Sequence, residues 1–200
     1  MIKYEAVLLI GPTGSGKGTQ AKKLEELGNY VHISMGDTKR ELYTQSPELI
    51  REYDFFRSKR DHLNASLTFV KMLDHAIEQL KIHRGYDPNA HRLVIDGIPR
   101  YEAQISPIDE RLEIYRVFHF DAPNQISYER VATRSQNGQR PKDLNVEVTR
   151  AKLARFKKST LPVIREYESR NLLTTLDASK PIDDVHAAIL RILTQQDRTK

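Results

Sequence analysis

The sequence GPTGSGKGTQ at residues 11–20 joins an apolar run to a helical pattern. The run, AVLLI at residues 6–10, has the length and composition of a buried β-strand. After the glycines, Ala21, Leu24 and Leu27 fall on one face of a helix that Gly28 would end. A strand, a glycine-rich loop and a helix in this order are the setting of a phosphate-binding loop. Such glycines let the backbone turn tightly and aim successive N–H groups at an anion.

Two polar residues of this loop strengthen the interpretation. Lys17 supplies a mobile positive charge for outer phosphates, and Thr19 supplies a hydroxyl for a metal ion. The common pattern ends in Lys followed directly by Ser or Thr, whereas here Gly18 stands between them. The alternative is a glycine turn that binds nothing. It is disfavoured because a short turn needs neither this many glycines nor a lysine.

Composition sets limits on the class of protein. A chain of 200 residues suits one domain with a substantial core, and 30% charged with 38% hydrophobic residues is an ordinary soluble balance. The absence of cysteine excludes disulfides, thiolate zinc sites and cysteine nucleophiles. The longest apolar runs, about five residues, are too short for a membrane span. No signal peptide fits, so we expect a cytoplasmic protein.

The net charge of +5 suggests either nucleic-acid binding or a cluster of cations for a small polyanion such as ATP. The basic residues are dispersed, and aromatic residues do not alternate with them as they do in single-strand binders. The small polyanion is therefore favoured, with neither nucleic acid nor a membrane as partner.

Strand-like runs recur along the chain with helical patterns between them, at residues 7–10, 30–33, 93–95, 117–120 and 172–176. This alternation predicts an α/β fold with a parallel sheet and helices on both faces. A long gap before the third run predicts a small helical lobe at about 34–80, and the polar stretch 135–145 predicts a short flap. The lobe has one stripe at helical spacing, which we interpret as core packing: Leu63, Leu67, Val70, Leu73, Ile77 and Leu80.

Ligands of open α/β sheets bind beyond the carboxyl ends of the strands, where HISMGD (32–37) and DGIPR (96–100) should meet the glycine loop. Asp96 ends an apolar strand, where a carboxylate suits Mg²⁺; a helix cap is the alternative. Pro99 predicts a helix start that places Arg100 and Gln104 on one face, for a phosphate and a base edge. A solvated side chain is the alternative for Gln104.

Further arginines follow the same regions of the chain. Ser34 and Asp37 are cap-type residues before a helix that carries Arg40, and Arg130 and Arg134 share a helical face. Others lie in or after the flap: Arg140, Arg150, Lys152 and Arg155. Each alone suits a solvated surface, but together, beside a phosphate loop, they indicate polyanion binding. The seven histidines show no ligand spacing and are interpreted as structural or surface residues.

This set of residues suits phosphoryl transfer, in which positioning and fixed positive charge supply most of the catalysis. A nucleoside monophosphate carries a phosphate whose second pKa is about 6, so it needs no general base at neutral pH. A hydroxyl acceptor would need one. The excess of arginine therefore favours a phosphate acceptor, and two mobile lobes would exclude water.

The ordered motifs resemble those of the adenylate kinase family of nucleoside monophosphate kinases. They are GPTGSGKGTQA, HISMGD, DGIPR with Gln104, FDAP with ER and R, RxxD at 140–143, TLPVI at 160–164 and DASKP at 177–181. The resemblance covers nearly the whole chain, least well residues 41–80. It implies a single phosphate-loop (P-loop) kinase domain over 1–200, with a five-stranded parallel sheet flanked by helices. It also implies an acceptor-binding lobe at about 34–80, a short lid at about 135–145 and a monomer.

The resemblance also implies roles for individual residues. ATP would contact Gly14, Ser15, Gly16, Lys17, Gly18, Thr19, Arg130, Arg134, Lys180 and Pro181. The acceptor nucleotide would contact Ser34, Met35, Arg40, Leu63, Gly97, Arg100, Gln104, Arg140 and Lys152. Catalysis would use Lys17, Arg40, Arg100, Arg134, Arg140 and Arg150. Mg²⁺ would be held, partly through water, by Thr19, Asp37 and Asp96. No zinc is expected, because the lid is of the short type.

Departures from the family pattern leave three functions open. Gln104 favours AMP as acceptor and hence an ATP:AMP phosphotransferase. Met35 replaces the usual Thr or Ala, and DHLNAS at 61–66 replaces the usual lobe segment, which favours a UMP/CMP or deoxynucleotide kinase. Lys142 and Lys152 replace an acid and an arginine of the lid, which favours a nucleotide-binding regulatory protein on a kinase scaffold. Lysine keeps the charge but loses the bidentate fork, which Arg150 or Arg155 would then supply.

Overall fold

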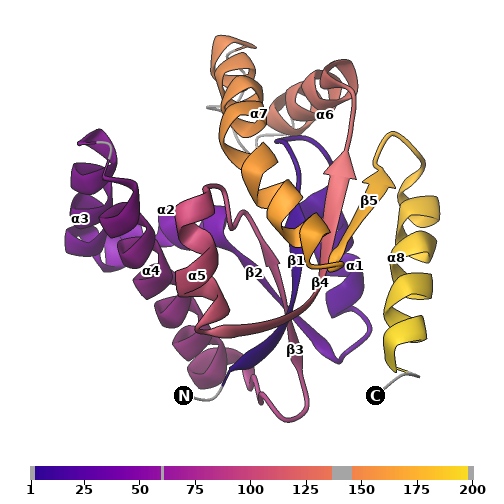
Figure 1. Cartoon of the computed structure of the whole chain (residues 1–200), viewed down its shortest axis with the longest axis horizontal. Coiled ribbons are helices and arrows are strands. Elements are labelled where there is room, and N and C mark those ends of the chain that lie inside the picture. Colours follow the sequence, from indigo (N-terminus) through magenta and orange to yellow (C-terminus); the bar gives the residue numbers. More distant parts are fainter. Residues whose placement is uncertain (1–2, 60, 137–145, 198–200) are drawn as a thin grey trace.

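A parallel sheet of five strands forms the centre of the molecule (Figure 1). The computed structural model describes residues 3–59, 61–136 and 146–197. The strands are β1 (Tyr4–Ile10), β2 (Tyr30–Ser34), β3 (Arg92–Asp96), β4 (Leu112–Asp121) and β5 (Leu173–Asp177). Their order is β2-β3-β1-β4-β5, and every adjacent pair is parallel. The predicted parallel sheet is confirmed.

Helices cover both faces of this sheet. They are α1 (Lys17–Glu25), α2 (Met35–Gln45), α3 (Pro47–Ser58), α4 (His62–Arg84), α5 (Ile105–Asp109), α6 (Asn124–Gln136), α7 (Val146–Ser169) and α8 (Ile182–Asp197), with a 3₁₀ turn η1 (Glu102–Gln104). Alternate residues of β1 enter two separate cores, as the two-residue period of a strand requires. Leu8 packs toward α4, α5 and α7, whereas Leu9 packs toward α1 and α8. Burial on both faces explains why β1 is apolar without interruption.

All five predicted strands form, but two are longer than expected. β1 begins at Tyr4, and β4 begins at Leu112. The first half of β4 contains Glu113 and Arg116, which interrupt the apolar run that the prediction relied on. The second half, in which Val117, Phe118 and Phe120 are fully buried, is the more apolar part, although His119 interrupts it.

Residues 34–80, predicted as a helical lobe, form α2, α3 and most of α4. Most of the predicted stripe on α4 is core, because Val70, Leu73, Ile77 and Leu80 are buried. The prediction is wrong for Leu63 and Leu67, which are 59% and 45% exposed. The small residues Ala65 and Ser66 face inward there instead. They let the antiparallel helices α3 and α4 pack closely, which spacing alone did not reveal.

The flap predicted at 135–145 lies mostly outside the described residues, because α6 continues to Gln136 and residues 137–145 are not described. Arg140 and Lys142 belong to that part of the chain. Among the described residues, no helix combines the length and the apolar character that crossing a bilayer requires.

Candidate functional site

The glycine loop between β1 and α1 adopts a backbone that requires glycine. Gly14 has φ +79° and Gly16 has φ +93°, both in the left-handed region. A Cβ atom on Gly14 would lie 2.5 Å from the carbonyl oxygen of Ser127 in α6. Gly16 is the N-cap of α1, and no side chain caps it. The first N–H groups of α1 therefore stay available to an anion.

Lys17 folds back over this loop. Its Nζ lies 2.7 Å from the carbonyl oxygens of Gly11 and Pro12, and 3.2 Å from Ser15 Oγ. These contacts hold the ammonium group above the loop, at the carboxyl end of β1. The exposed side chain of Thr19 lies in the first turn of the same helix.

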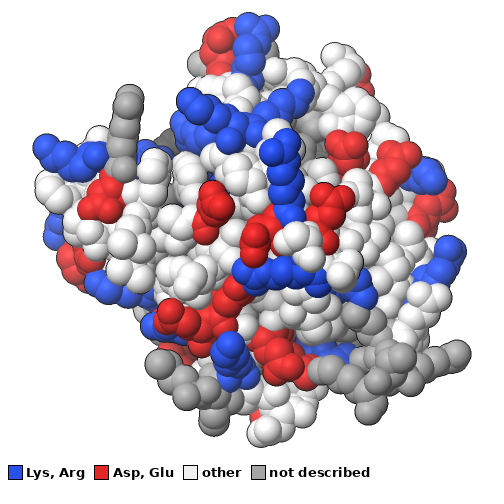
Figure 2. Space-filling model, in the orientation of Figure 1, with Lys and Arg blue, Asp and Glu red and all other residues white. Residues whose placement is uncertain are grey.

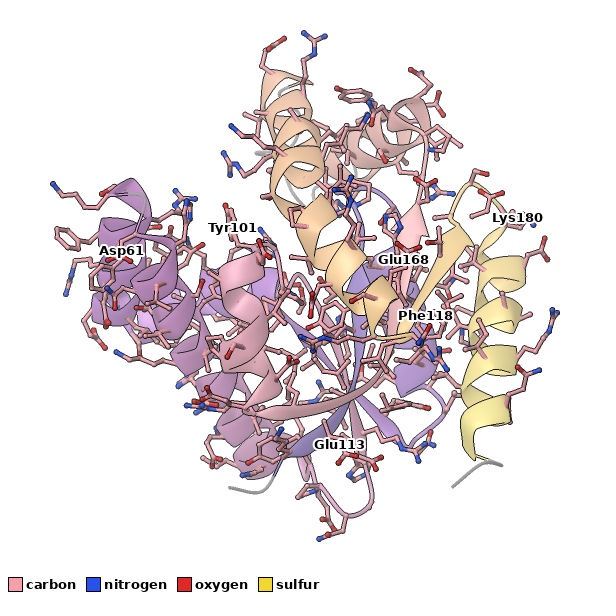
Figure 3. The ribbon with its side chains drawn as sticks, viewed as in Figure 1. Asp61, Tyr101, Glu113, Phe118, Glu168 and Lys180 are labelled. Atoms are coloured by element: carbon pink, nitrogen blue, oxygen red, sulfur yellow. The ribbon has the colours of Figure 1, made fainter. Side chains whose placement is uncertain are left out.

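A pocket of about 640 Å³ opens beside the loop and extends toward α8. Its lining combines the loop with α1, α6 and the β5–α8 turn: Gly14, Ser15, Gly16, Thr19, Gln20, Phe120, Glu129, Arg130, Thr133, Arg134, Ala178, Lys180, Ile182 and Val185. Arg130 donates from Nη1 to the carbonyl oxygen of Ala178 at 2.8 Å and so closes one side. Figure 3 labels Lys180 in the β5–α8 turn, the segment that also contains Pro181. A pocket of this size holds a nucleotide.

A second cationic group lies at the carboxyl ends of β2 and β3. Arg100 donates from Nε to the carbonyl oxygen of Gly97 at 2.7 Å. Gly97 has φ +92°, and a Cβ atom there would lie 3.2 Å from an Arg100 nitrogen and 3.6 Å from Met35 Cβ. Arg40 pairs with Asp37 in the first turns of α2 and lies against Gly36. The two guanidinium groups thus lie beside the glycines that follow the two strands, Arg40 beside Gly36 after β2 and Arg100 beside Gly97 after β3.

Asp96 has a partner that the sequence did not suggest. Its Oδ2 lies 2.8 Å from Nε2 of His32 on the adjacent strand. Burial acts to raise the pKa of Asp96, but the bond to His32 and the charges of Lys17 and Arg100 outweigh it, and the pKa lies below its usual value. The carboxylate is therefore ionised at neutral pH. The sequence indicates only a structural or surface role for His32. Its partner lies on the adjacent strand but 64 positions away in the chain, so spacing alone does not reveal the pair.

The helix predicted to start at Pro99 does not form there. The Ile98–Pro99 peptide is cis, and regular structure begins only with η1 at Glu102. Gln104 is 2% exposed, which excludes the solvated alternative, and its Oε1 accepts from the backbone N–H of Arg100 (2.6 Å) and of Tyr101 (3.3 Å). Gln104 and Arg100 are still close, but through a turn and not through a helical face.

The basic residues of α7 lie away from these groups in the described structure. Figure 2 shows lysine and arginine side chains gathered over α7, where Arg150, Lys152 and Arg155 are exposed. Arg150 lies 3.3 Å from Glu147 of its own helix. Leu63 is exposed on α4 and contributes to neither cationic group.

Comparison with known proteins settles the family. The family model described as "Adenylate kinase" matches residues 9–172. This chain belongs to the adenylate kinase family.

Relatives of both acceptor types match nearly the full length. UMP-CMP kinase of Danio rerio is 28% identical over 201 residues, which are 98% of this chain and 100% of the relative. Adenylate kinase of Xanthomonas euvesicatoria is 32% identical over 193 residues, which are 94% and 98%. UMP-CMP kinase of Xenopus laevis is 30% identical over 200 residues, which are 96% and 99%. The protein is therefore a nucleoside monophosphate kinase, a transferase that binds ATP.

Within this family assignment, the geometry separates the predicted residues into two groups. Most of those assigned to ATP line one pocket: Gly14, Ser15, Gly16, Thr19, Arg130, Arg134 and Lys180. The acceptor-side residues Met35, Arg40, Gly97 and Arg100 meet at the second cationic group. Sequence reasoning missed His32, Thr160 and His186, whose partners lie on other elements. A polar residue in an otherwise apolar stripe was the only available signal for Thr160.

Proposed function

We propose that this enzyme transfers the γ-phosphoryl group of ATP to AMP, in line and without a covalent intermediate. The observation that carries the proposal is that Arg40 and Arg100 lie beyond the carboxyl ends of β2 and β3, at the same edge of the sheet as the phosphate loop. β3, which precedes Arg100, pairs directly with β1, which precedes the loop. One cationic group for each polyanion is what transfer between two phosphates requires.

The loop backbone would hold the triphosphate of ATP. Lys17 would exchange its bonds to the Gly11 and Pro12 carbonyls for phosphate oxygens, which accept more strongly because they are charged. The base would enter the pocket between Arg130 and the β5–α8 turn, with Lys180 and Pro181 at its edge. Arg134 lines the same pocket and would bind the outer phosphates.

Arg40 and Arg100 would hold the acceptor phosphate, and their paired donors match its oxygens. No side chain has to remove a proton, because the acceptor phosphate is largely dianionic at neutral pH. When the lid closes, the transferred phosphoryl group would be approached by Arg140, Arg150 and Lys152. Closure would exclude water from that group.

The residues present fit a magnesium ion. The ionised carboxylate of Asp96 is a hard oxygen ligand, and its Oδ2 is oriented by His32. Thr19, with Asp96 and Asp37 acting partly through water, would hold Mg²⁺. The ion supplies charge neutralisation between the phosphates.

A second acceptor class is favoured by the state of Gln104. Its Oε1 is occupied by two backbone N–H groups, so the amide offers a base only its nitrogen, which is a donor. A donor suits the carbonyl oxygens of uracil or cytosine as well as a ring nitrogen of adenine, but the amine of adenine would need the occupied oxygen. Met35 is buried beside Gly97, and its bulk would leave less room for the acceptor base. UMP and CMP are therefore the alternative acceptors.

Phosphoryl transfer with Mg²⁺·ATP and AMP, CMP, UMP, GMP or dTMP, each offered separately, tests the proposal. The highest kcat/KM with AMP is the expected result. A preference for UMP or CMP would replace AMP and leave the mechanism in place. Binding of ATP without transfer to any acceptor would contradict the proposed activity.

Replacement of the acceptor arginine gives a second test. Arg100→Ala should lower kcat/KM at least 10²-fold, the order expected for one charged group in a transition state. The melting temperature should change little, because the guanidinium group is exposed. Arg84→Ala is the control, because Arg84 is an exposed arginine that pairs with Glu25. Full activity in Arg100→Ala would contradict the acceptor assignment.

A further inference from the structure

A chain of hydrogen bonds forms the back wall of the ATP pocket. Gln20 of α1 is 3% exposed, and its Nε2 donates to the carbonyl oxygen of Ile182 at 2.8 Å. Its Oε1 lies 3.0 Å from Nδ1 of His186 in α8. Gln20, Ile182 and Val185 line the pocket. His186 is not among the lining residues and contacts the pocket only through Gln20.

The chemistry of the partners fixes the direction of each bond. A backbone carbonyl can only accept, so the amide nitrogen of Gln20 must face Ile182. The amide oxygen then faces His186, so the imidazole must carry its proton on Nδ1. Burial, with the nearby charge of Lys23, lowers the pKa of His186 and keeps the ring neutral at neutral pH. The Ile182 carbonyl and the His186 N–H thus both favour the same orientation of the buried amide.

Gln20 also belongs to the helix that the phosphate loop begins. Its backbone N–H donates to the carbonyl oxygen of Gly16 at 3.1 Å. Gly16 is the left-handed residue at the N-cap of α1. The backbone of Gln20 is thus joined to the phosphate loop, and its side chain is joined to the wall formed by the start of α8. The two helices pack into the same hydrophobic core.

We propose that His186 is a positioning residue for the donor nucleotide. His186 holds the Gln20 amide against the carbonyl of Ile182. This bond fixes the start of α8, which forms the wall beside the base, relative to the loop that binds the phosphates. The inference rests on the proposed binding of ATP in this pocket. Because the base and the phosphates of one molecule must meet both surfaces at once, a displaced wall weakens binding of the base and leaves phosphate binding unchanged.

Binding of ATP and of tripolyphosphate, measured by calorimetry on the full chain, tests the proposal. Tripolyphosphate carries the phosphates of ATP without a base. His186→Leu removes the donor at similar bulk and should weaken ATP binding about 5- to 10-fold, as loss of one buried hydrogen bond predicts. Tripolyphosphate binding should stay within about twofold. His186→Asn places an amide donor near the position of Nδ1 and should restore ATP binding.

Steady-state kinetics and a second pair of variants separate positioning from general destabilisation. His186→Leu should raise the KM for ATP and leave kcat and the acceptor KM unchanged. Gln20→Leu should show the same loss, and the double variant no further loss, because both act through one amide. His83→Leu is the matched control, because the same substitution is made at an exposed histidine of α4 that does not line the pocket; the variant should bind ATP normally.

Equal weakening of ATP and tripolyphosphate would overturn the inference, as would unchanged ATP binding in His186→Leu or additive losses in the double variant. The unsubstituted chain tests the proposed function separately. If it bound tripolyphosphate and ATP equally well, or bound neither, the proposed binding of ATP in this pocket would be contradicted.

Discussion

At the residue scale, charged side chains of the candidate site are held by hydrogen bonds to other protein groups. The Arg100 guanidinium is held by the nearby carbonyl of Gly97, and the Asp96 carboxylate by His32 of the adjacent strand. A charged group held in advance loses little freedom when it binds a phosphate, and this raises the effect of each charge. One buried side chain does the opposite and costs stability. Tyr86 is 4% exposed, and its hydroxyl has no hydrogen-bond partner among the described residues.

Tyr86→Phe should therefore stabilise the protein by about 1 kcal/mol near neutral pH, because it removes a buried, unpaired hydroxyl. Burial, with the nearby Tyr4, raises the pKa of Tyr86 to about 12. The neutral phenol is thus favoured in the folded state, and its contribution is complete below about pH 10 and lost as pH rises through the folded value. Phe cannot ionise, so urea titrations should show less alkaline destabilisation in the variant.

Tyr30→Phe is the matched control, because Tyr30 is also buried but its hydroxyl accepts a hydrogen bond from Tyr115. That variant should lose stability near neutral pH. Destabilisation of Tyr86→Phe by more than about 1 kcal/mol would mean that the hydroxyl has a partner, such as a bound water.

At the element scale, α7 joins the two halves of the site. Thr160 on its buried face is 2% exposed, and its Oγ1 donates to the carbonyl oxygen of Arg100 at 3.3 Å. Phe156, one turn earlier, stacks on His119 of β4 at 6.3 Å between ring centroids. The same helix carries Arg150 and Lys152 near its other end. The position of α7 therefore affects both Arg100, proposed to bind the acceptor, and the cations proposed to act in the lid.

Thr160→Val keeps the shape of the side chain and removes its donor, so the Arg100 carbonyl loses its bond to α7. We expect the acceptor KM to rise about 3- to 10-fold, the value of one hydrogen bond, with the KM for ATP unchanged. Thr160→Ser should restore it. Ser159→Ala is the control, because the Ser159 hydroxyl bonds only within the helix, to the Arg155 carbonyl. A fall in melting temperature with an unchanged acceptor KM would assign Thr160 a purely structural role.

The β1–α1 loop and α6 form another contact between elements. Gly14→Ala should destabilise the fold by about 2 kcal/mol, because a Cβ atom would strain φ and meet the Ser127 carbonyl. ATP binding should fall with it. Gly18→Ala should be neutral or slightly stabilising, because a Cβ atom there meets nothing within 4 Å and alanine favours a helix. Chemical denaturation of both variants checks this contrast, which equal losses would contradict.

At the scale of the whole molecule, charge is distributed in favour of anionic substrates. The chain carries 32 Lys and Arg against 27 Asp and Glu. Several of the cations meet at the carboxyl edge of the sheet: Lys17, Arg40, Arg100, Arg130 and Arg134. A concentration of one sign of charge at a pocket raises the rate of encounter with ligands of the other sign.

Added salt should therefore lower the rate at which substrate binds more than the rate of phosphoryl transfer. Between about 20 mM and 0.3 M potassium chloride, kcat/KM for Mg²⁺·ATP should fall several-fold, because the Debye length shrinks. At saturating substrate, kcat should stay within about twofold. A parallel loss of kcat and kcat/KM would contradict electrostatic steering and indicate direct damage to the site.

Local patterns predicted much of this molecule because their physical basis is local. A buried strand needs a run of apolar residues, so residues 6–10 and 93–95 were identifiable. Tight turns need glycine, so the phosphate loop was as well. Gln104 and Leu63 show where such reasoning stops. The helix predicted from Pro99 does not form, because the Gln104 side chain binds the backbone N–H groups of Arg100 and Tyr101 in a turn. The predicted buried face of α4 is wrong only at Leu63 and Leu67, where the small residues Ala65 and Ser66 are buried instead.

The sequence by itself determined the strands, the phosphate loop, the parallel α/β class and the excess of arginine near the strand ends. Only the tertiary structure decided which partner each polar group would have: His32 for Asp96, Thr160 for the Arg100 carbonyl, and His186 for Gln20. The physical reason is range. Strand and turn preferences act over a few residues, whereas these hydrogen bonds join groups 60 to 166 positions apart, which only the packing of separate elements brings together.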